Sequence, residues 1–169
     1  PDCAQLQELL ALAAAAPDHG QLTPWRFVIV PAQQRHRLAE VFAQALHDRD
    51  PQASEAQLAS AREKAHRAPL LMVAVARLGQ REPDTPPLER MVAMGAAIQN
   101  ILLGAHAMGF GAGLTSGKAM ASSRLRALLA LPQDEVAVCC VNIGTATRNK
   151  PRDGLRPEPN DFVSTLGEA

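Results

Sequence analysis

The chain has 169 residues, of which 47% are hydrophobic, and it carries 17 acidic and 17 basic side chains. This length fits one domain with a substantial core, so we treat residues 1–169 as a single domain. The balanced charge excludes a general nucleic-acid-binding protein, which would carry a basic excess.

The first half of the chain predicts helices alternating with strands. Apolar spacing from Leu6 to Ala13 predicts a helix that ends before Pro17. The β-branched, apolar segment from Arg26 to Val30 predicts a strand. Two further helices are expected, over Gln33 to His47 and Ser54 to His66.

The second half of the chain contains the two clearest buried strands. The run PLLMVAVA, Pro69 to Ala76, is too continuous to have a face in water, which favours a central position in a sheet. Val136 to Ile143 predicts a second such strand. Between them, proline-rich Gln80 to Pro87 predicts a loop or lid. Ser122 or Ser123 can cap a short helix that continues to Leu129.

The longest predicted helix is central to this organisation. Apolar residues recur there at steps of three and four, over about 20 residues or roughly 30 Å. Gly95 and Gly104 lie inside it and indicate a need for close packing, because glycine weakens a helix. The helix is expected to end at Gly109 and to pass through a glycine turn into a short exposed segment. The apolar stripe consists of Met91, Met94, Ile98, Ile101, Ala105 and Met108.

These elements favour an α+β fold, in which helices pack around a small sheet. A doubly wound parallel fold fits less well, because only three strands are strong and no Gly-x-Gly-x-x-Gly follows any of them. Residues 150–169, with prolines and charges from Lys150 to Pro159, are expected to form an extended C-terminal arm.

Cysteine usage and polarity bear on location. The three cysteines are an odd count, and Cys139 and Cys140 lie in an apolar run. We therefore expect buried thiols in a reducing, cytoplasmic compartment, with neither a disulfide framework nor a metal site. The long apolar stretch contains Gln99, Asn100 and His106, so it is not expected to span a membrane.

Three segments resemble the FMN-dependent nitroreductase family. Residues 16–19, Ala-Pro-Asp-His, followed by Thr-Pro-Trp-Arg-Phe at 23–27, are similar to the family's Ser-x-Asn-x-Gln-Pro-Trp-x-Phe region. Residues 97–105, with Gly-Phe-Gly at 109–111, resemble its central helix and the glycine turn after it, and residues 143–145 resemble its last strand. The Ala-Pro-Asp-His form points to the small, YdjA-like branch of NAD(P)H nitroreductases.

The resemblance implies a mostly antiparallel sheet flanked by helices, in an obligate homodimer with two FMN sites at the subunit interface. NAD(P)H would reduce the flavin and leave, and a nitroaromatic, quinone or similar small molecule would then accept the electrons. This chemistry belongs to the cofactor, so no catalytic side chain and no metal are expected.

The resemblance also implies roles for individual residues. Leu114, Thr115 and Ser116 would contact the flavin of one site, and Ala15 and His19 would reach it from the other subunit. Lys150 and Arg152 are candidates for the flavin phosphate, whereas Arg156 is expected to be solvated. The NAD(P) contact that the resemblance implies comprises Gly104, Ala105, His106, Ala107, Met108 and Gly109.

Two features depart from the family pattern. The family's Arg-x-Ser phosphate-binding segment would precede Pro1, and Ala15 stands where relatives carry an arginine. No residue in an identifiable position reads the ribose, so the choice between NADH and NADPH stays open.

Alternatives remain open for several residues. His19 either hydrogen-bonds the flavin or is a turn histidine in contact with solvent. Trp25 is expected to anchor its strand in the core, and the methionine stripe is expected to be core or dimer seam. Gln99 and Asn100 need partners if they are buried, and a hydrogen bond across the dimer is expected to satisfy them.

Two other functions fit the same sequence. The chain could bind or consume flavin on this scaffold without acting as a nitroreductase. It could also be a structural homodimer without a cofactor, an alternative motivated by Ala15 and the phosphate-binding segment.

Overall fold

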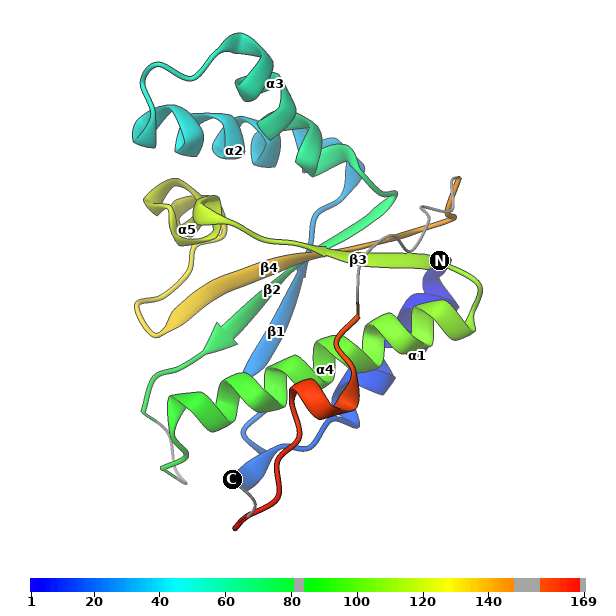
Figure 1. Cartoon of the computed structure of the whole chain (residues 1–169). Helices are drawn as coiled ribbons and strands as arrows, with labels where there is room; N and C mark the ends of the chain where they lie inside the picture. The colour runs from blue at the N-terminus through cyan, green and yellow to red at the C-terminus, as the bar shows by residue number, and fades with distance from the viewer. Residues whose placement is uncertain (81–83, 148–155, 168–169) are drawn as a thin grey trace.

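The computed structural model of the chain describes residues 1–80, 84–147 and 156–167. Its strands are β1 (Trp25–Ile29), β2 (Leu70–Arg77), β3 (Gly111–Thr115) and β4 (Glu135–Gly144). Its α-helices are α1 (Cys3–Ala14), α2 (Arg35–Arg49), α3 (Glu55–Glu63), α4 (Pro87–Ala107) and α5 (Ser123–Leu128) (Figure 1). Its short 3-10 segments are η1 (His19–Gln21), η2 (Ala32–Gln34), η3 (Lys64–His66), η4 (Lys118–Ala121) and η5 (Pro159–Asp161).

The predicted helices and the three predicted strands are all present, with ends that differ by a few residues. The segment expected to be a helix up to His66 finishes in the 3-10 segment η3. Ser54 and Ser122 cap α3 and α5, where their side chains accept hydrogen bonds from the backbone N–H groups of Gln57 and Leu125.

The four strands form one antiparallel sheet in the order β1-β2-β4-β3. β2 and β4 lie at its centre, as their continuous apolar runs predict, and β1 and β3 lie at its edges. The mostly antiparallel α+β fold expected from the sequence is therefore confirmed. The glycine turn after α4 and the exposed segment that follows it are confirmed, because Gly109 has φ of +82° and Ala112, Gly113 and Leu114 are exposed. That this segment, Gly111–Thr115, forms the strand β3 was not predicted.

Two helical layers cover the two faces of the sheet (Figure 1). α1 and α4 pack on one face, over a core that includes Trp25, Met72 and Val141. α2, α3 and α5 pack on the other face, where Leu71 and Val73 alternate with that first set, as residues of a strand do. The expectation that Trp25 anchors its strand in the core is confirmed, because only 6% of it is exposed.

A close contact joins α1 to α4. A Cβ atom on Gly104 would lie 3.1 Å from a methyl carbon of Leu9 and still closer to Leu12, so any larger residue would force these side chains to move. The packing need predicted for Gly104 is confirmed. Gly95, in contrast, has open space where its Cβ would be within the single chain.

Asn100 has a hydrogen-bond partner within its own chain. Its side-chain Nδ2 donates to the backbone oxygen of Leu12, at 2.9 Å. This bond joins α4 to α1, and the hydrogen bond expected across a dimer stays a prediction. Gln99 is exposed and needs no buried partner.

One buried arginine ties the other layer to the sheet. Arg35, 5% exposed, donates to four backbone oxygens, on Val30, Ala65, Ala68 and Pro69, at 2.7 to 3.1 Å. Desolvation lowers the pKa of its guanidinium. These bonds join the end of β1, η3 and the start of β2.

Residues 156–167, near the end of the chain, are exposed throughout, as expected for part of an extended arm.

The three cysteines differ in burial. Cys139 and Cys140 are buried free thiols, but Cys3 is exposed, contrary to the expectation of buried cysteines. In the described ranges, no helix has the length and apolarity needed to cross a membrane.

Candidate functional site

The candidate site is a groove at the end of the sheet where β3 begins and β4 ends. Its volume is about 510 Å³, within the size range of small-molecule sites. Gly111–Gly113 of β3 and Gly144 of β4 line it. The Ala146 and Pro69 side chains lie over Gly111 and Gly144, whereas the backbone at Gly113 is open. The turn before β2 closes one side with Arg67, Ala68 and Pro69, and Thr145, Ala146 and Thr147 close the other.

Local geometry explains why β3 can line a groove. Gly109, with φ of +82°, reverses the chain after α4. Among the described residues β3 pairs with β4 alone, so its other edge is open there, and Ala112, Gly113 and Leu114 are exposed. A Cβ atom on Gly113 would meet nothing within 4 Å. This part of the site is a flat surface open to a ligand.

Asn142 of β4 supplies the polar wall of the groove. Its Nδ2 donates to Thr115 Oγ1 at 3.1 Å. Its Oδ1 is buried and has no hydrogen-bond partner in the described part of the chain. A buried acceptor without a partner is costly, so it favours a ligand or water that donates a hydrogen bond there.

A β-bulge in β4 positions the end of β3. The β2–β4 register shifts between Ala74 and Val75, which leaves Val138 as the extra residue. Ser116 Oγ donates to the freed Val138 oxygen at 2.9 Å. This bond fixes the turn that follows β3, directly after Leu114 and Thr115.

The three residues predicted to contact a flavin are thus together at the end of β3, but they do not all point the same way. Leu114 pairs with Val141, on the α1–α4 side of the sheet, and is 51% exposed. Thr115 pairs with Cys140, on the α2–α3 side. A ligand at this edge would contact both only by reaching around the open edge of β3.

Ala15 and His19 lie elsewhere in the chain. Both are exposed, at the end of α1 and in η1. His19 Nδ1 and Glu89 Oε2, near the start of α4, are 2.8 Å apart. β3 follows the other end of α4, whose 21 residues span about 30 Å. One chain therefore does not bring His19 to Leu114, Thr115 and Ser116.

The stretch predicted to contact NAD(P) divides into two parts. Gly104 and Ala105 are buried against α1 and offer no surface to a ligand, because packing the long helix uses them. His106, Ala107 and Gly109 are exposed and Met108 is half-buried, so these four remain accessible at the end of α4.

The predicted phosphate ligands Lys150 and Arg152 lie outside the described residues. Within the groove, Arg67 supplies a cation that sequence reasoning missed, and Asn142 supplies a polar side chain that it also missed. Neither residue stood out because each is an ordinary polar residue in its own segment. Only sheet pairing brings them to one groove.

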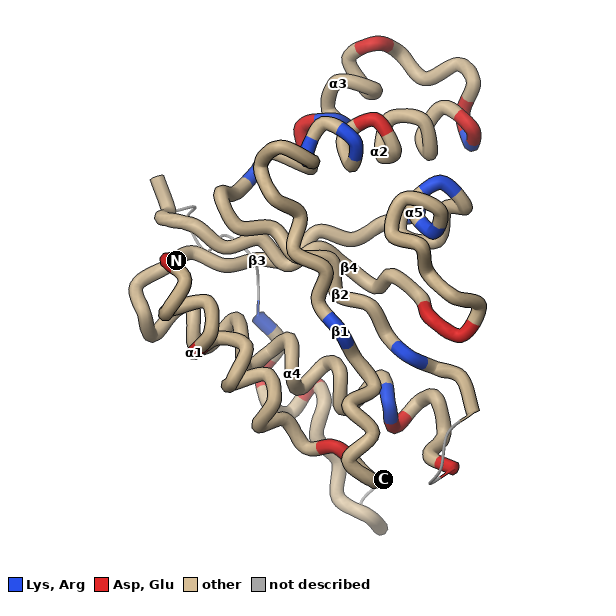
Figure 2. The backbone as a smooth tube through the Cα atoms, turned by 180° about the vertical axis from the view of Figure 1, so that it is seen from behind, with Lys and Arg blue, Asp and Glu red and all other residues tan. Residues whose placement is uncertain are grey.

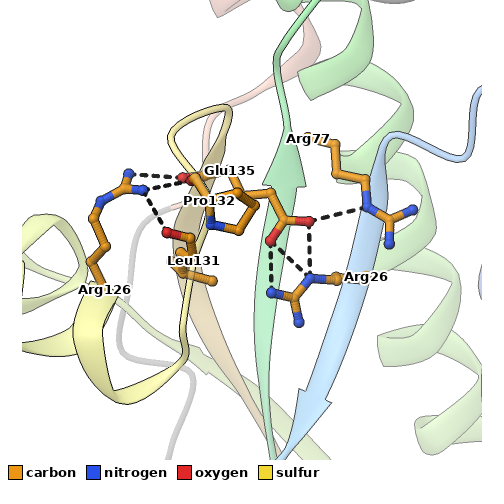
Figure 3. Close-up of polar contacts among 6 residues, drawn as sticks. All are labelled: Arg26, Arg77, Arg126, Leu131, Pro132 and Glu135. Atoms are coloured by element: carbon orange, nitrogen blue, oxygen red, sulfur yellow. Dashed lines mark hydrogen bonds and ion pairs between the residues drawn. The ribbon is translucent and has the colours of Figure 1, made fainter.

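Other titratable clusters lie apart from the groove. Arg26 and Arg77 hold the buried Glu135 carboxylate at 2.6 and 3.2 Å, and Arg126 holds its backbone oxygen from the other side (Figure 3). Hydrogen bonds from Arg26 hold the pKa of Glu135 below its ordinary value, against desolvation. Glu135 begins β4 and the groove lies at the end of that strand.

The two buried thiols, Cys139 and Cys140, offer no nucleophile. Burial raises the pKa of Cys140 to about 12, and it also raises the pKa of Cys139. In the described ranges, no three His, Cys, Asp or Glu side chains gather in a way that could hold a metal.

The residues present fit a flavin, the cofactor implied by the resemblance. The open position over Gly113 accepts a flat ring, and the unpartnered Asn142 Oδ1 suits a polar ring edge with an N–H donor. Arg67 suits an anionic tail.

Comparisons with known proteins identify the family of the chain. The sequence profile described as "Nitroreductase family" matches residues 1–145. The chain is 30% identical over 166 residues to "Putative NAD(P)H nitroreductase" of Haemophilus influenzae, covering 98% of this chain and 89% of that protein. It is 27% identical over 164 residues to "Putative NAD(P)H nitroreductase YdjA" of Escherichia coli, covering 97% and 88%.

Solved structures share the fold. A nitroreductase-like family protein from Bacillus cereus matches with a TM-score of 0.77 at 21% identity, over 99% of this chain and 87% of that one. An FMN-dependent nitroreductase from Clostridium difficile R20291 matches with a TM-score of 0.67 at 18% identity, over 99% and 90%.

Proposed function

This chain belongs to the nitroreductase family, and we propose that it is an FMN-dependent oxidoreductase that uses NAD(P)H to reduce small acceptors such as nitroaromatics or quinones. The observation that carries the proposal is the groove beside β3. Its floor is open backbone at Gly113, and its wall holds the buried Oδ1 of Asn142, which has no hydrogen-bond partner among the described residues. This combination fits a planar ring with hydrogen-bond donors at its edge.

The working unit of this proposal is a homodimer built along α4. The outer face of α4 exposes Leu88, Val92 and Leu103 at 76%, 68% and 58%. Gly95, near the middle of the helix, leaves open space for a second backbone. A row of large exposed apolar side chains indicates a surface that another protein covers.

A two-fold axis near Gly95 would complete the site. Such symmetry pairs the start of one α4 with the end of the other. It would bring Ala15 and His19 of one subunit toward β3 of its partner, which one chain alone does not do for His19. The His19–Glu89 contact of 2.8 Å would orient the imidazole there.

Bound FMN would supply the hydride and electron transfer. The protein would hold the ring against the open edge of β3, with the backbone around Thr115 and Ser116 at the ring edge. Asn142 Oδ1 would accept a hydrogen bond, and Arg67 would lie toward the phosphate. Leu114, half-exposed at this edge, would shield the ring from water.

The visible spectrum of the purified full-length protein tests the proposal. We expect a yellow protein with flavin absorbance that bleaches anaerobically with NADPH or NADH and returns when menadione is added. A colourless protein that takes up no added FMN would refute the proposal and support the structural-homodimer alternative. Loss of the reduced flavin itself under oxygen would instead indicate a flavin-consuming protein.

A further inference from the structure

A second, smaller cleft lies beside the groove, between α2, α3 and the segment that follows β3. Its volume is about 70 Å³. Thr115 and Ser116 form part of its wall, so it adjoins the proposed flavin edge. Its floor is apolar, and its rim is cationic: Phe42, Leu46, Ala61 and Met120 form the floor, and Arg49, Lys64 and Lys118 form the rim.

The rim cations differ from other cations of the same helical layer. Arg62 and Arg124 are paired with Glu40 and Asp48, at 2.8 and 2.6 Å. In the described part of the chain, no carboxylate is within ion-pair distance of Arg49, Lys64 or Lys118.

No carboxylate lines the cleft either. The acidic residues nearest in sequence to the rim are Asp48, which Arg124 holds, and the exposed Asp50 and Glu63. The cleft therefore has a positive potential that favours an anion.

The size and polarity of the cleft limit the kinds of ligand that it can bind. A volume of about 70 Å³ accommodates a group the size of a phosphate, but not a whole nucleotide. Lysines bind phosphate as mobile point charges. Ser116 Oγ is committed to the Val138 oxygen, whereas Thr115 Oγ1 accepts from Asn142 and keeps its own hydrogen free to donate.

We propose that this cleft binds a phosphate group of the nicotinamide co-substrate, with the rest of that molecule lying outside along β3. This inference rests on the proposed function, which brings NAD(P)H to the same edge. Neutral quinones and nitroaromatics have no need of three cations, whereas every nicotinamide dinucleotide carries phosphates. The shared wall at Thr115 and Ser116 would hold the phosphate within reach of the flavin edge.

Substitution of the two lysines tests the cleft. In the full-length protein, Lys64→Gln with Lys118→Gln should raise the Kd of NADP⁺ by about tenfold or more, measured by isothermal titration calorimetry. The Kd of FMN should stay unchanged. The KM of NADPH should rise together with the Kd of NADP⁺, whereas the KM of menadione, a neutral acceptor, should not change. Arg37→Gln is the matched control, because Arg37 is exposed on α2 but does not line the cleft.

Three results would overturn the inference. The Kd of NADP⁺ could be unchanged in the double variant. FMN could be the ligand that weakens, which would assign the cleft to the flavin phosphate. An anionic acceptor, para-nitrobenzoate, could be the only substrate whose KM rises, which would assign the cleft to acceptors of that charge.

Two controls keep the test decisive. If circular dichroism shows that the double variant is unfolded, Lys118→Gln alone gives the same test, because Lys118 is exposed. A wild-type protein that binds no FMN would defeat the proposed function, but the NADP⁺ titration would still measure this cleft separately.

Discussion

The two helical layers differ in what their outer surfaces present. On α2 and α3, acidic and basic side chains are interspersed (Figure 2), and Arg62 and Arg124 are paired with carboxylates. On α4, the outer face carries Leu88, Val92 and Leu103, all more than half exposed. The α2–α3 layer has a surface suited to water, whereas α4 has a surface suited to another protein chain.

The layers also differ in how they are held to the rest of the molecule. α4 meets α1 through close apolar packing at Gly104, whereas α2 reaches the sheet through the buried guanidinium of Arg35. One hydrogen bond, from Asn100 to the Leu12 oxygen, adds to the packing of α4 on α1. The inner face of α4 therefore builds the fold, while Leu88, Val92 and Leu103 on its outer face stay exposed.

Breaking the outer face of α4 should have the largest effect. Val92→Asp with Leu103→Asp would place unpaired carboxylates in the proposed dimer interface, at a cost of several kcal/mol. We expect a dimer Kd raised at least a hundredfold, seen as monomer by analytical ultracentrifugation, with FMN lost in parallel. Ala59→Asp on exposed α3 is the control and should leave the dimer intact. A variant that remains fully dimeric would contradict the assignment of this face.

Removing the buried anchor of the other layer comes next. Arg35→Met would leave four backbone oxygens without their donor, so the free energy of unfolding should fall by about 3 kcal/mol. Urea unfolding measures this. Arg37→Met, on the exposed side of the same helix, should change stability far less. Equal losses in the two variants would show that the four hydrogen bonds of Arg35 are not what holds this layer.

Glu135 begins β4, at the end of the sheet where Arg26 and Arg77 hold its carboxylate. Glu135→Gln should cost about 2 kcal/mol at pH 7, because Arg26 and Arg77 lose their shared carboxylate. The folded pKa of Glu135 lies below its ordinary value of 4.5. Its contribution is therefore complete above pH 4.5 and is lost as the pH falls through the lower folded pKa.

The midpoint of urea unfolding, measured from pH 7 to pH 3 for the wild type and for Glu135→Gln, checks this pH dependence. The wild type should lose stability toward pH 3 more steeply than Glu135→Gln, so the two curves should converge in acid. Parallel curves would mean that the carboxylate does not titrate with folding.

The smallest effect is expected for the exposed ion pairs of the α2–α3 layer. Arg62→Ala should shift the midpoint of thermal unfolding by less than about 2 °C, because water replaces the contact with Glu40. Differential scanning calorimetry at low and high salt measures it. A larger shift of the midpoint would mean that surface ion pairs stabilise the α2–α3 layer. That result would contradict the difference drawn here between this layer and α4.

Sequence reasoning succeeded where one segment decides its own structure. β2 and β4 are continuous apolar runs, and α4 has a strict three-and-four spacing, so each was recognised with nearly its observed ends. It failed at β3, because the residues GAGLT have three exposed positions and two glycines that are poor strand formers. Pairing with β4 alone makes that segment a strand.

The site shows the same limit. Leu114, Thr115 and Ser116 could be named from a family resemblance, but Asn142 and Arg67 could not, because they come from separate strands and turns. The same holds for Arg49, Lys64 and Lys118, which are far apart in the chain and meet at one cleft. The contact of Asn100 with Leu12 was not predicted, because the two residues are 88 positions apart in sequence.

The sequence by itself determined the helices, the three strong strands and the family, because periodicity and short motifs are properties of single segments. Only the tertiary structure decided the β3 edge, the unpartnered oxygen of Asn142 and the separation of His19 from Leu114 along α4. These depend on which backbones approach each other, and packing and hydrogen bonding settle that across the whole chain.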